Sequence, residues 1–314
     1  MKSAQLGRTD INVCVAPFGA MYLGVKQDQA ASFELLDLYT SRGGDFIDTA
    51  NIYAHWVGDE WHGGESENLL GEWLKARGNR NDLVIASKVG FGYGDVPTGL
   101  TKNLIKTECE KSLKRMGIET IDLYFAHVDD RDTGYEETLT AFGELVKEGK
   151  VRAIGASNYT TFRLAEANAV AAANGLPRYE VLQQRHSYVR PRYDADFGPQ
   201  LTLTANMAEY CADADMSIMA YSAGLGGAYS GEPGRELDAN YVSRDTELRM
   251  EALGAVAAEL GVSPQQIVLA WMMNTPGMMP LVAASGVTQL NANLDAADMV
   301  LSAQQMERLN AAGE

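Results

Sequence analysis

Short apolar runs alternate with longer amphipathic stretches along most of the chain. Within the runs, hydrophobic residues are consecutive rather than alternating with polar ones, which is typical of strands buried on both faces. In the longer stretches, hydrophobic residues recur at helical spacing. Alternating strands and helices favour parallel pairing of the strands. We expect eight strands, which begin at Val13, Phe46, Leu83, Ile121, Val151, Val181, Ser217 and Met279.

Eight strand–helix units predict a closed (β/α)8 barrel, and we expect residues 1–314 to form a single domain of this kind. No linker rich in Pro, Gly or Ser and no block of like charge divides the chain. The opening LGRTDINV (residues 6–13) is expected to form a small hairpin at the barrel bottom, and residues 223–245 a Gly-rich loop over the active face. A doubly wound sheet is the competing fold, but its G-x-G-x-x-G pattern does not occur.

Composition narrows the class of protein further. Hydrophobic content of 46% and charged content of 22% are typical of a soluble globular protein, and no apolar run reaches the length of a membrane-spanning helix. The N-terminus lacks the apolar core of a secretory signal, and the three distant cysteines form neither a disulfide framework nor a zinc spacing. We therefore expect a cytoplasmic protein without a membrane or metal partner. A net charge of −16 argues against a nucleic-acid partner, and the oligomeric state stays open.

Four residues at predicted strand ends carry the candidate chemistry: Asp48, Tyr53, Lys88 and His127. In a parallel barrel these ends converge on the face where such barrels perform catalysis. Tyr53 is the candidate proton donor, Lys88 is expected to lower the pKa of its phenol, and Asp48 is expected to keep Lys88 charged. His127 is expected to orient a substrate carbonyl. The set suits carbonyl reduction, and a nicotinamide cofactor has to supply the hydride because no side chain does.

Each of these residues also has a structural interpretation. Asp48 suits a helix or turn cap, Tyr53 and His127 suit ordinary packing, and Lys88 suits a paired or exposed charge. Their coincidence at strand ends of one barrel favours the catalytic interpretation.

The residues around this set resemble the aldo-keto reductase family, in the form of a bacterial-type member with a short C-terminal loop. The resemblance runs nearly end to end and includes GGDFIDTANIYA (43–54), GESENLLG (64–71), ASKVG (86–90) and GASNY (155–159). It implies that the four residues form the catalytic tetrad, with Tyr53 as the acid. The assignment of Gln183 is ambiguous by one position because Gln184 follows it. The resemblance also implies cofactor contacts at Gly19, Ala20, Met21, Ser157, Asn158, Gln183, Tyr221, Ser222, Ser285, Gln289 and Asn293.

The chain departs from the family pattern at Gly286, where a basic residue commonly pairs with the 2′-phosphate of the cofactor. The resemblance implies NADP(H) as the cofactor, and Gly286 leaves NAD(H) open. His186 stands where many members have Tyr, and we expect it to pack rather than face substrate. Tyr22 and Trp56 are candidates to line the substrate site. Aromatic residues in the lining favour an apolar or ring-bearing carbonyl compound as substrate.

We therefore expect an NAD(P)H-dependent reductase of aldehydes or ketones that acts on small molecules. Two alternatives stay open. One is a nicotinamide-binding regulatory barrel akin to the β subunits of potassium channels, and the other is a barrel lyase or isomerase without a nicotinamide cofactor. The same barrel hosts many chemistries, so the fold alone does not decide between them.

Overall fold

The computed structural model describes residues 1–313. Eight parallel strands form one sheet in chain order. The edges of this sheet meet, because Phe18 pairs in parallel with Val282 and the Gly19 amide donates to the Val282 carbonyl at 2.8 Å. The predicted (β/α)8 barrel is therefore confirmed. Its strands are β3 (Phe18–Gly19), β4 (Phe46–Asp48), β5 (Val84–Val89), β6 (Ile121–Ala126), β7 (Val151–Ser157), β8 (Tyr179–Arg185), β9 (Ser217–Tyr221) and β10 (Met278–Pro280).

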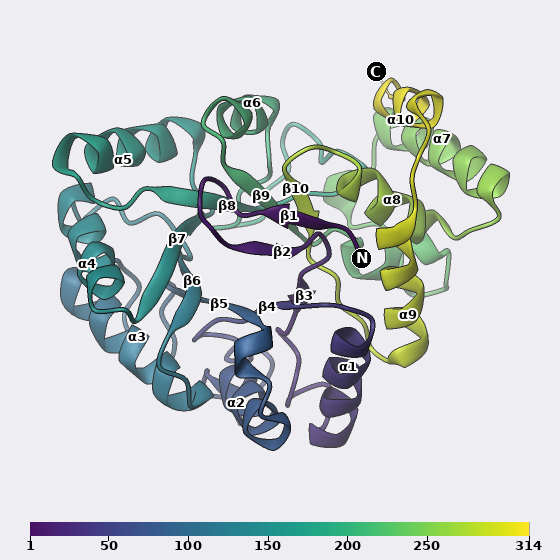
Figure 1. The fold of residues 1–314 in the computed structure, drawn as a ribbon. Helices are drawn as coiled ribbons and strands as arrows, with labels where there is room; N and C mark the ends of the chain where they lie inside the picture. Colours follow the sequence, from purple (N-terminus) through teal and green to yellow (C-terminus); the bar gives the residue numbers. More distant parts are fainter. Residues whose placement is uncertain (314) are drawn as a thin grey trace.

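Helices surround this sheet on the outside (Figure 1). Their ends follow local sequence signals, as in the helix over Lys102–Met116. Thr101 caps it by accepting from the Leu104 amide, and Gly117 ends it with a left-handed φ of 64°. The helices of the described residues are α1 (Gln29–Ser41), α2 (Glu65–Arg77), α3 (Lys102–Met116), α4 (Tyr135–Lys147), α5 (Thr161–Asn174), α6 (Ala205–Asp213), α7 (Arg244–Leu260), α8 (Pro264–Met273), α9 (Val287–Asp295) and α10 (Ala303–Asn310).

The central strands are buried along their whole length. Every residue of β5 and of β6 is buried. The interior of the barrel covers one face of these strands, and the helices cover the other. This explains the consecutive apolar residues in the sequence. It also means that a charged residue such as Lys88 in β5 has to find its partners inside the barrel.

A small hairpin lies at the bottom of the barrel, where it was predicted. Its strands are β1 (Ser3–Gln5) and β2 (Asn12–Cys14), which pair antiparallel. Ser217, the first residue of β9, accepts a hydrogen bond from the Gly7 amide at 2.9 Å and donates one to the Gln5 carbonyl at 3.2 Å. Figure 1 shows the hairpin, in purple, crossing the barrel opening.

The predicted start of the first barrel strand at Val13 is wrong. Val13 belongs to the hairpin strand β2, and the barrel strand β3 begins at Phe18. Val13 and Val15 are both buried, at 0% and 7% exposure. The hairpin and the first strand therefore produce one uninterrupted apolar run, and hydrophobicity alone does not divide it.

The Gly-rich segment 223–245 is the predicted loop after β9, but it contains local structure. Two 3-10 helices, Leu225–Ser230 and Ala239–Tyr241, occupy much of it. Two further 3-10 helices lie at Arg80–Asp82 and Ala296–Asp298. They are short, which explains why hydrophobic periodicity did not reveal them.

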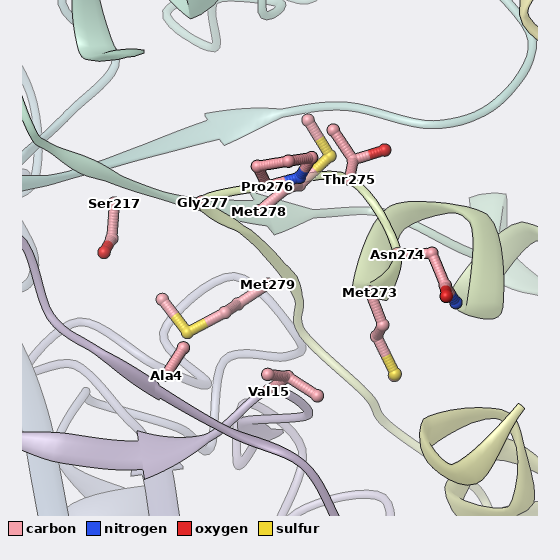
Figure 2. A pocket seen from close by; sticks show the side chains of 10 residues that line it. All are labelled: Ala4, Val15, Ser217, Met273, Asn274, Thr275, Pro276, Gly277, Met278 and Met279. Carbon is pink, nitrogen blue, oxygen red and sulfur yellow. The ribbon is translucent and has the colours of Figure 1, made fainter. Parts of the chain in front are cut away.

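A cavity of about 160 Å³ lies between the hairpin and the start of β10. Figure 2 shows Ala4, Val15 and Met279 among its lining residues. It is therefore at the bottom of the barrel, away from the carboxyl ends of the strands.

Within the described residues, no single helix is long and apolar enough to cross a membrane. The pair α7 and α8 meets the criterion of length and composition together, but it is bent by 96°.

Candidate active site

The structure brings the four predicted residues together at the carboxyl ends of β4, β5 and β6. Lys88 Nζ lies 2.7 Å from Asp48 Oδ2, 2.7 Å from Tyr53 Oη and 2.7 Å from the Thr49 carbonyl. The rings of Tyr53 and His127 meet edge to face, with centroids 6.1 Å apart. All four are buried, with exposures of 0% for Asp48 and Lys88, 8% for Tyr53 and 9% for His127.

Asp48 balances the buried charge of Lys88. Its Oδ2 accepts from the ammonium, and its Oδ1 accepts from Gln183 Nε2 at 2.9 Å. Burial lowers the pKa of Lys88 below its usual value, and the Asp48 carboxylate opposes this. The carboxylate is thus held by three donors, from Lys88, Gln183 and Tyr53, and the ammonium by three acceptors, as a buried pair requires.

The pKa of Tyr53 is not lowered overall, contrary to what was expected from Lys88, although Lys88 Nζ lies 2.7 Å from the phenol oxygen. Burial raises the pKa of Tyr53 well above its usual value, and the charge of Asp48 raises it further. Asp48 Oδ2 lies 3.4 Å from Tyr53 Oη, so ionisation would bring two negative groups together. The phenol therefore stays protonated, which is the form that can donate a proton.

His127 is a neutral imidazole. Burial, and then the charge of Lys88, hold its pKa well below the usual value. Its backbone is fixed, because its amide donates to the Val89 carbonyl at 2.7 Å and its carbonyl accepts from Asn158 Nδ2 at 2.9 Å. Its buried Nδ1 has no hydrogen-bond partner within residues 1–313.

Asn158 directly follows β7, has a left-handed φ of 59°, and links neighbouring elements through hydrogen bonds of its side chain. Its Nδ2 donates to Ser157 Oγ as well as to the His127 carbonyl, and its Oδ1 accepts from Tyr221 Oη and the Leu201 amide. Both ends of the amide are therefore occupied by protein groups.

The two adjacent glutamines of β8 face different surroundings. Gln183 points to Asp48, whereas Gln184 Oε1 accepts from the Asn158 amide at 2.6 Å and its Nε2 donates to the Tyr159 carbonyl. Oε1 of Gln183 accepts no hydrogen bond from any residue that the structure describes. Of the two, Gln183 is therefore the one beside the four residues.

The predicted cofactor residues of the first strand also adjoin the site. Gly19 lies opposite Asp48 in the parallel register of β3 and β4. The Ala20 amide donates to the Asp48 carbonyl at 2.9 Å. Met21 and Tyr22 follow directly, and Tyr22 is close enough to Tyr53 to contribute to its raised pKa.

Tyr221 and Ser222 lie at the end of β9. Tyr221 Oη donates to Asn158 Oδ1 at 2.7 Å, and the ring is close enough to Tyr53 to affect its pKa. Ser222 has a left-handed φ of 58°, and its hydroxyl accepts from Arg185 Nη1 at 3.3 Å. Arg185 was not among the residues that the sequence singled out.

The remaining predicted cofactor residues lie in and just before α9. Gln289 Oε1 accepts from both the amide and the hydroxyl of Ser285, and Asn293 Nδ2 donates to the Ala283 carbonyl. Gly286 caps the helix with an extended φ of −170°, and a Cβ added there would meet no atom within 4 Å. The amide groups of a helix N-terminus suit a phosphate group.

Aromatic rings stand next to two of the four central residues. Trp56 meets the Tyr53 ring edge to face at 6.0 Å and is 50% exposed. Phe91 meets the His127 ring edge to face at 4.8 Å. The sequence-based prediction included Trp56 but missed Phe91. Its signal was its place just after ASKVG, close to the end of the strand that carries Lys88.

His186 packs against a helix, as the sequence predicts. Its ring lies 5.8 Å from that of Trp271 in α8. No group of His, Cys, Asp or Glu side chains within residues 1–313 has the arrangement of a metal site.

A sequence model of the aldo/keto reductase family matches residues 17–314. The chain therefore belongs to this family, and it is an oxidoreductase.

Three relatives illustrate the similarity. The chain is 30% identical to an aryl-alcohol dehydrogenase (NADP+) of Phanerodontia chrysosporium, over 96% of this chain and 82% of that protein. It is 29% identical to a norsolorinic acid reductase of Aspergillus flavus, over 93% of this chain and 74% of that protein. It is 28% identical to the uncharacterised oxidoreductase YrpG of Bacillus subtilis, over 99% of this chain and 95% of that protein.

Proposed function

We propose that this protein reduces aldehydes or ketones to alcohols with NAD(P)H, and that Tyr53 donates the proton. One observation carries the proposal: a single ammonium, Lys88 Nζ, lies 2.7 Å from both Tyr53 Oη and Asp48 Oδ2 at the carboxyl ends of barrel strands. The family and its oxidoreductase relatives support the class of reaction. A cytoplasmic location stays a prediction.

The residues present fit a nicotinamide cofactor. Gln183 Oε1 accepts no hydrogen bond from residues 1–313 and offers an acceptor for a carboxamide beside Asp48. Tyr221 presents a ring at the end of the neighbouring strand. The N-terminus of α9 offers backbone amides to a phosphate. When bound, a reduced nicotinamide supplies a hydride to the carbonyl carbon.

The side chains of the site would then complete the reduction. Tyr53 holds its proton, because burial and Asp48 raise its pKa, and gives it to the carbonyl oxygen. Lys88 donates a hydrogen bond to the phenol oxygen, so it stabilises that oxygen as the proton leaves. Neutral His127 lies beside the Tyr53 ring and orients the carbonyl.

We propose a ring-bearing carbonyl compound as substrate, because Trp56 and Phe91 flank Tyr53 and His127. Two relatives are named for aryl alcohols and for norsolorinic acid. NADP(H) is the proposed cofactor, in line with the first of these names. We propose that NAD(H) is accepted as well, because Gly286 provides no cation for a 2′-phosphate.

Replacing Tyr53 with Phe tests the proposal. The variant keeps the ring but loses the acid, so we expect kcat to fall by about 100-fold or more and the Kd for NADPH to change by less than about twofold. Steady-state kinetics with an aromatic aldehyde and a fluorescence titration of NADPH give the two values. Tyr193→Phe, which removes the phenol of a fully exposed tyrosine, is the matched control and should keep wild-type kcat. A Tyr53→Phe enzyme with wild-type turnover would contradict the proposed role.

A further inference from the structure

Arg185, the last residue of β8, forms no ion pair with any residue that the structure describes. Among the arginines within residues 1–313, only Arg185 and Arg8 make none. Arg8 is exposed on the hairpin at the barrel bottom, whereas Arg185 is partly buried at the opposite end. A partly buried charge without a counter-ion destabilises the folded protein, so a bound anion would stabilise it.

The guanidinium of Arg185 is held in place by neutral groups. Its Nε donates to Tyr241 Oη at 3.1 Å, and its Nη1 donates to Gln200 Oε1 at 2.8 Å and to Ser222 Oγ at 3.3 Å. It also lies over the ring of Phe197, with its central carbon 4.2 Å from the ring centroid. Within residues 1–313, Nη2 donates no hydrogen bond. The structure therefore presents an oriented cation with unused donors.

Its position relates the cation to the proposed cofactor site. Arg185 lies opposite Tyr221 in the register of β8 and β9, and it follows Gln183 by two residues on the same strand. Its guanidinium contacts Ser222, which is one of the cofactor contacts that the family resemblance implies. A protein with a net charge of −16 needs a local cation to hold an anion there.

We propose that Arg185 binds a phosphate oxygen of the cofactor pyrophosphate beside Ser222. This inference rests on the proposed function. Among the described residues, the Nη2 group keeps its N–H donors free for a charge-assisted hydrogen bond to a phosphate oxygen, and Phe197 and Tyr241 fix the orientation of the guanidinium in advance. The pyrophosphate is common to NADH and NADPH, so Arg185 supports both cofactors equally. It is thus distinct from Gly286, which concerns the 2′-phosphate alone.

Cofactor affinity tests this inference without reference to turnover. Arg185→Gln removes the charge, and Kd is measured for NADPH, NADH and reduced nicotinamide riboside, which carries no phosphate. We expect the Kd of both dinucleotides to rise by about 10-fold or more, as for a lost charge-assisted hydrogen bond. The Kd of the riboside should change by less than about twofold, because it lacks the group that Arg185 binds.

Two further variants separate binding from folding. Arg192→Gln changes an exposed arginine in the segment after β8 that is already paired with Asp194, so its dinucleotide Kd should stay at the wild-type value. Arg185→Lys keeps the charge but loses the planar fork, and its Kd should lie between those of wild type and Arg185→Gln. It also provides the test if the Gln variant does not fold.

The outcomes distinguish the inference from the function on which it rests. If wild type binds and turns over with NADPH but the Arg185 variants keep its Kd, the inference is wrong and the function stands. If the variants instead weaken the apparent affinity for a benzaldehyde that bears a carboxylate, but not for benzaldehyde itself, the guanidinium serves an anionic substrate group, which also overturns the inference. If wild type binds neither dinucleotide, both proposals fail.

Discussion

Lys88 carries its charge inside the barrel because three oxygen atoms surround its ammonium. One is a carboxylate oxygen of Asp48, one a carbonyl and one the phenol of Tyr53, each at 2.7 Å. A buried ion pair contributes little net stability compared with apolar residues, but loss of one partner leaves the other uncompensated. Asp48 is therefore as important for the folded state as for the proposed chemistry.

Replacing Asp48 with Asn tests this balance. We expect the free energy of unfolding to fall by about 3 kcal/mol, because the ammonium loses the carboxylate with which it is paired. Urea denaturation measures the change. The double variant Asp48→Asn with Lys88→Met should recover stability but not turnover. If Asp48→Asn alone is as stable as wild type, Asp48 does not offset the buried charge of Lys88.

At the scale of residues, the sequence predicted which side chains meet but not the direction of every pKa. Strand ends in a barrel converge, so placing Asp48, Lys88 and His127 on strands was sufficient to bring them together. The raised pKa of Tyr53 depends on complete burial and on the 3.4 Å approach of Asp48. Those are tertiary distances, which no local pattern contains.

At the scale of elements, we propose that cofactor preference can be changed at the N-terminus of α9. Gly286 has an extended backbone that any residue adopts, and a Cβ there meets no atom within 4 Å. We therefore expect Gly286→Arg to fold normally. Its guanidinium would be available to a 2′-phosphate next to the helix amides.

The expected result is a ratio of kcat/KM for NADPH over NADH that rises by about 10-fold, which corresponds to about 1.4 kcal/mol. Gly286→Gln is the matched control, since it adds a long side chain without charge and should leave the ratio near that of wild type. An unchanged ratio in Gly286→Arg would show that the 2′-phosphate does not lie at this helix end.

The sequence predicted the strands well where each apolar run corresponds to a single strand. β5 and β6 are buried throughout, so their apolar runs mark them clearly. The prediction failed at Val13, because a hairpin strand and a barrel strand follow one another within a few apolar residues. Hydrophobic burial is the same in both, so only the tertiary pairing separates them.

At the scale of the whole molecule, two histidines with lowered pKa values predict acid sensitivity. Burial, and then the charge of Arg249, lower the pKa of His186 to about 4, below its usual value of 6.5. As pH falls, the unfolded chain binds the proton first, because its histidine has the higher pKa. The stability that neutral His186 contributes to the folded state is therefore fully present above pH 6.5 and is lost between 6.5 and 4. His127 has a lowered pKa and acts in the same direction.

Replacing His186 with Gln should reduce the slope of unfolding free energy against pH by up to about 1.4 kcal/mol per pH unit in this window. Urea denaturation of wild type and variant between about pH 4.5 and pH 7 measures both slopes. Identical slopes would show that His186 does not account for the acid sensitivity.

The central claim is that this barrel catalyses carbonyl reduction rather than only binding a cofactor. The most direct measurement follows reduced-cofactor oxidation and alcohol formation together, with an aromatic aldehyde and with NADPH and NADH side by side. We predict one alcohol formed for each cofactor oxidised, with turnover for both cofactors. Tight cofactor binding without any alcohol across a panel of aldehydes and ketones would contradict the claim and favour a regulatory barrel.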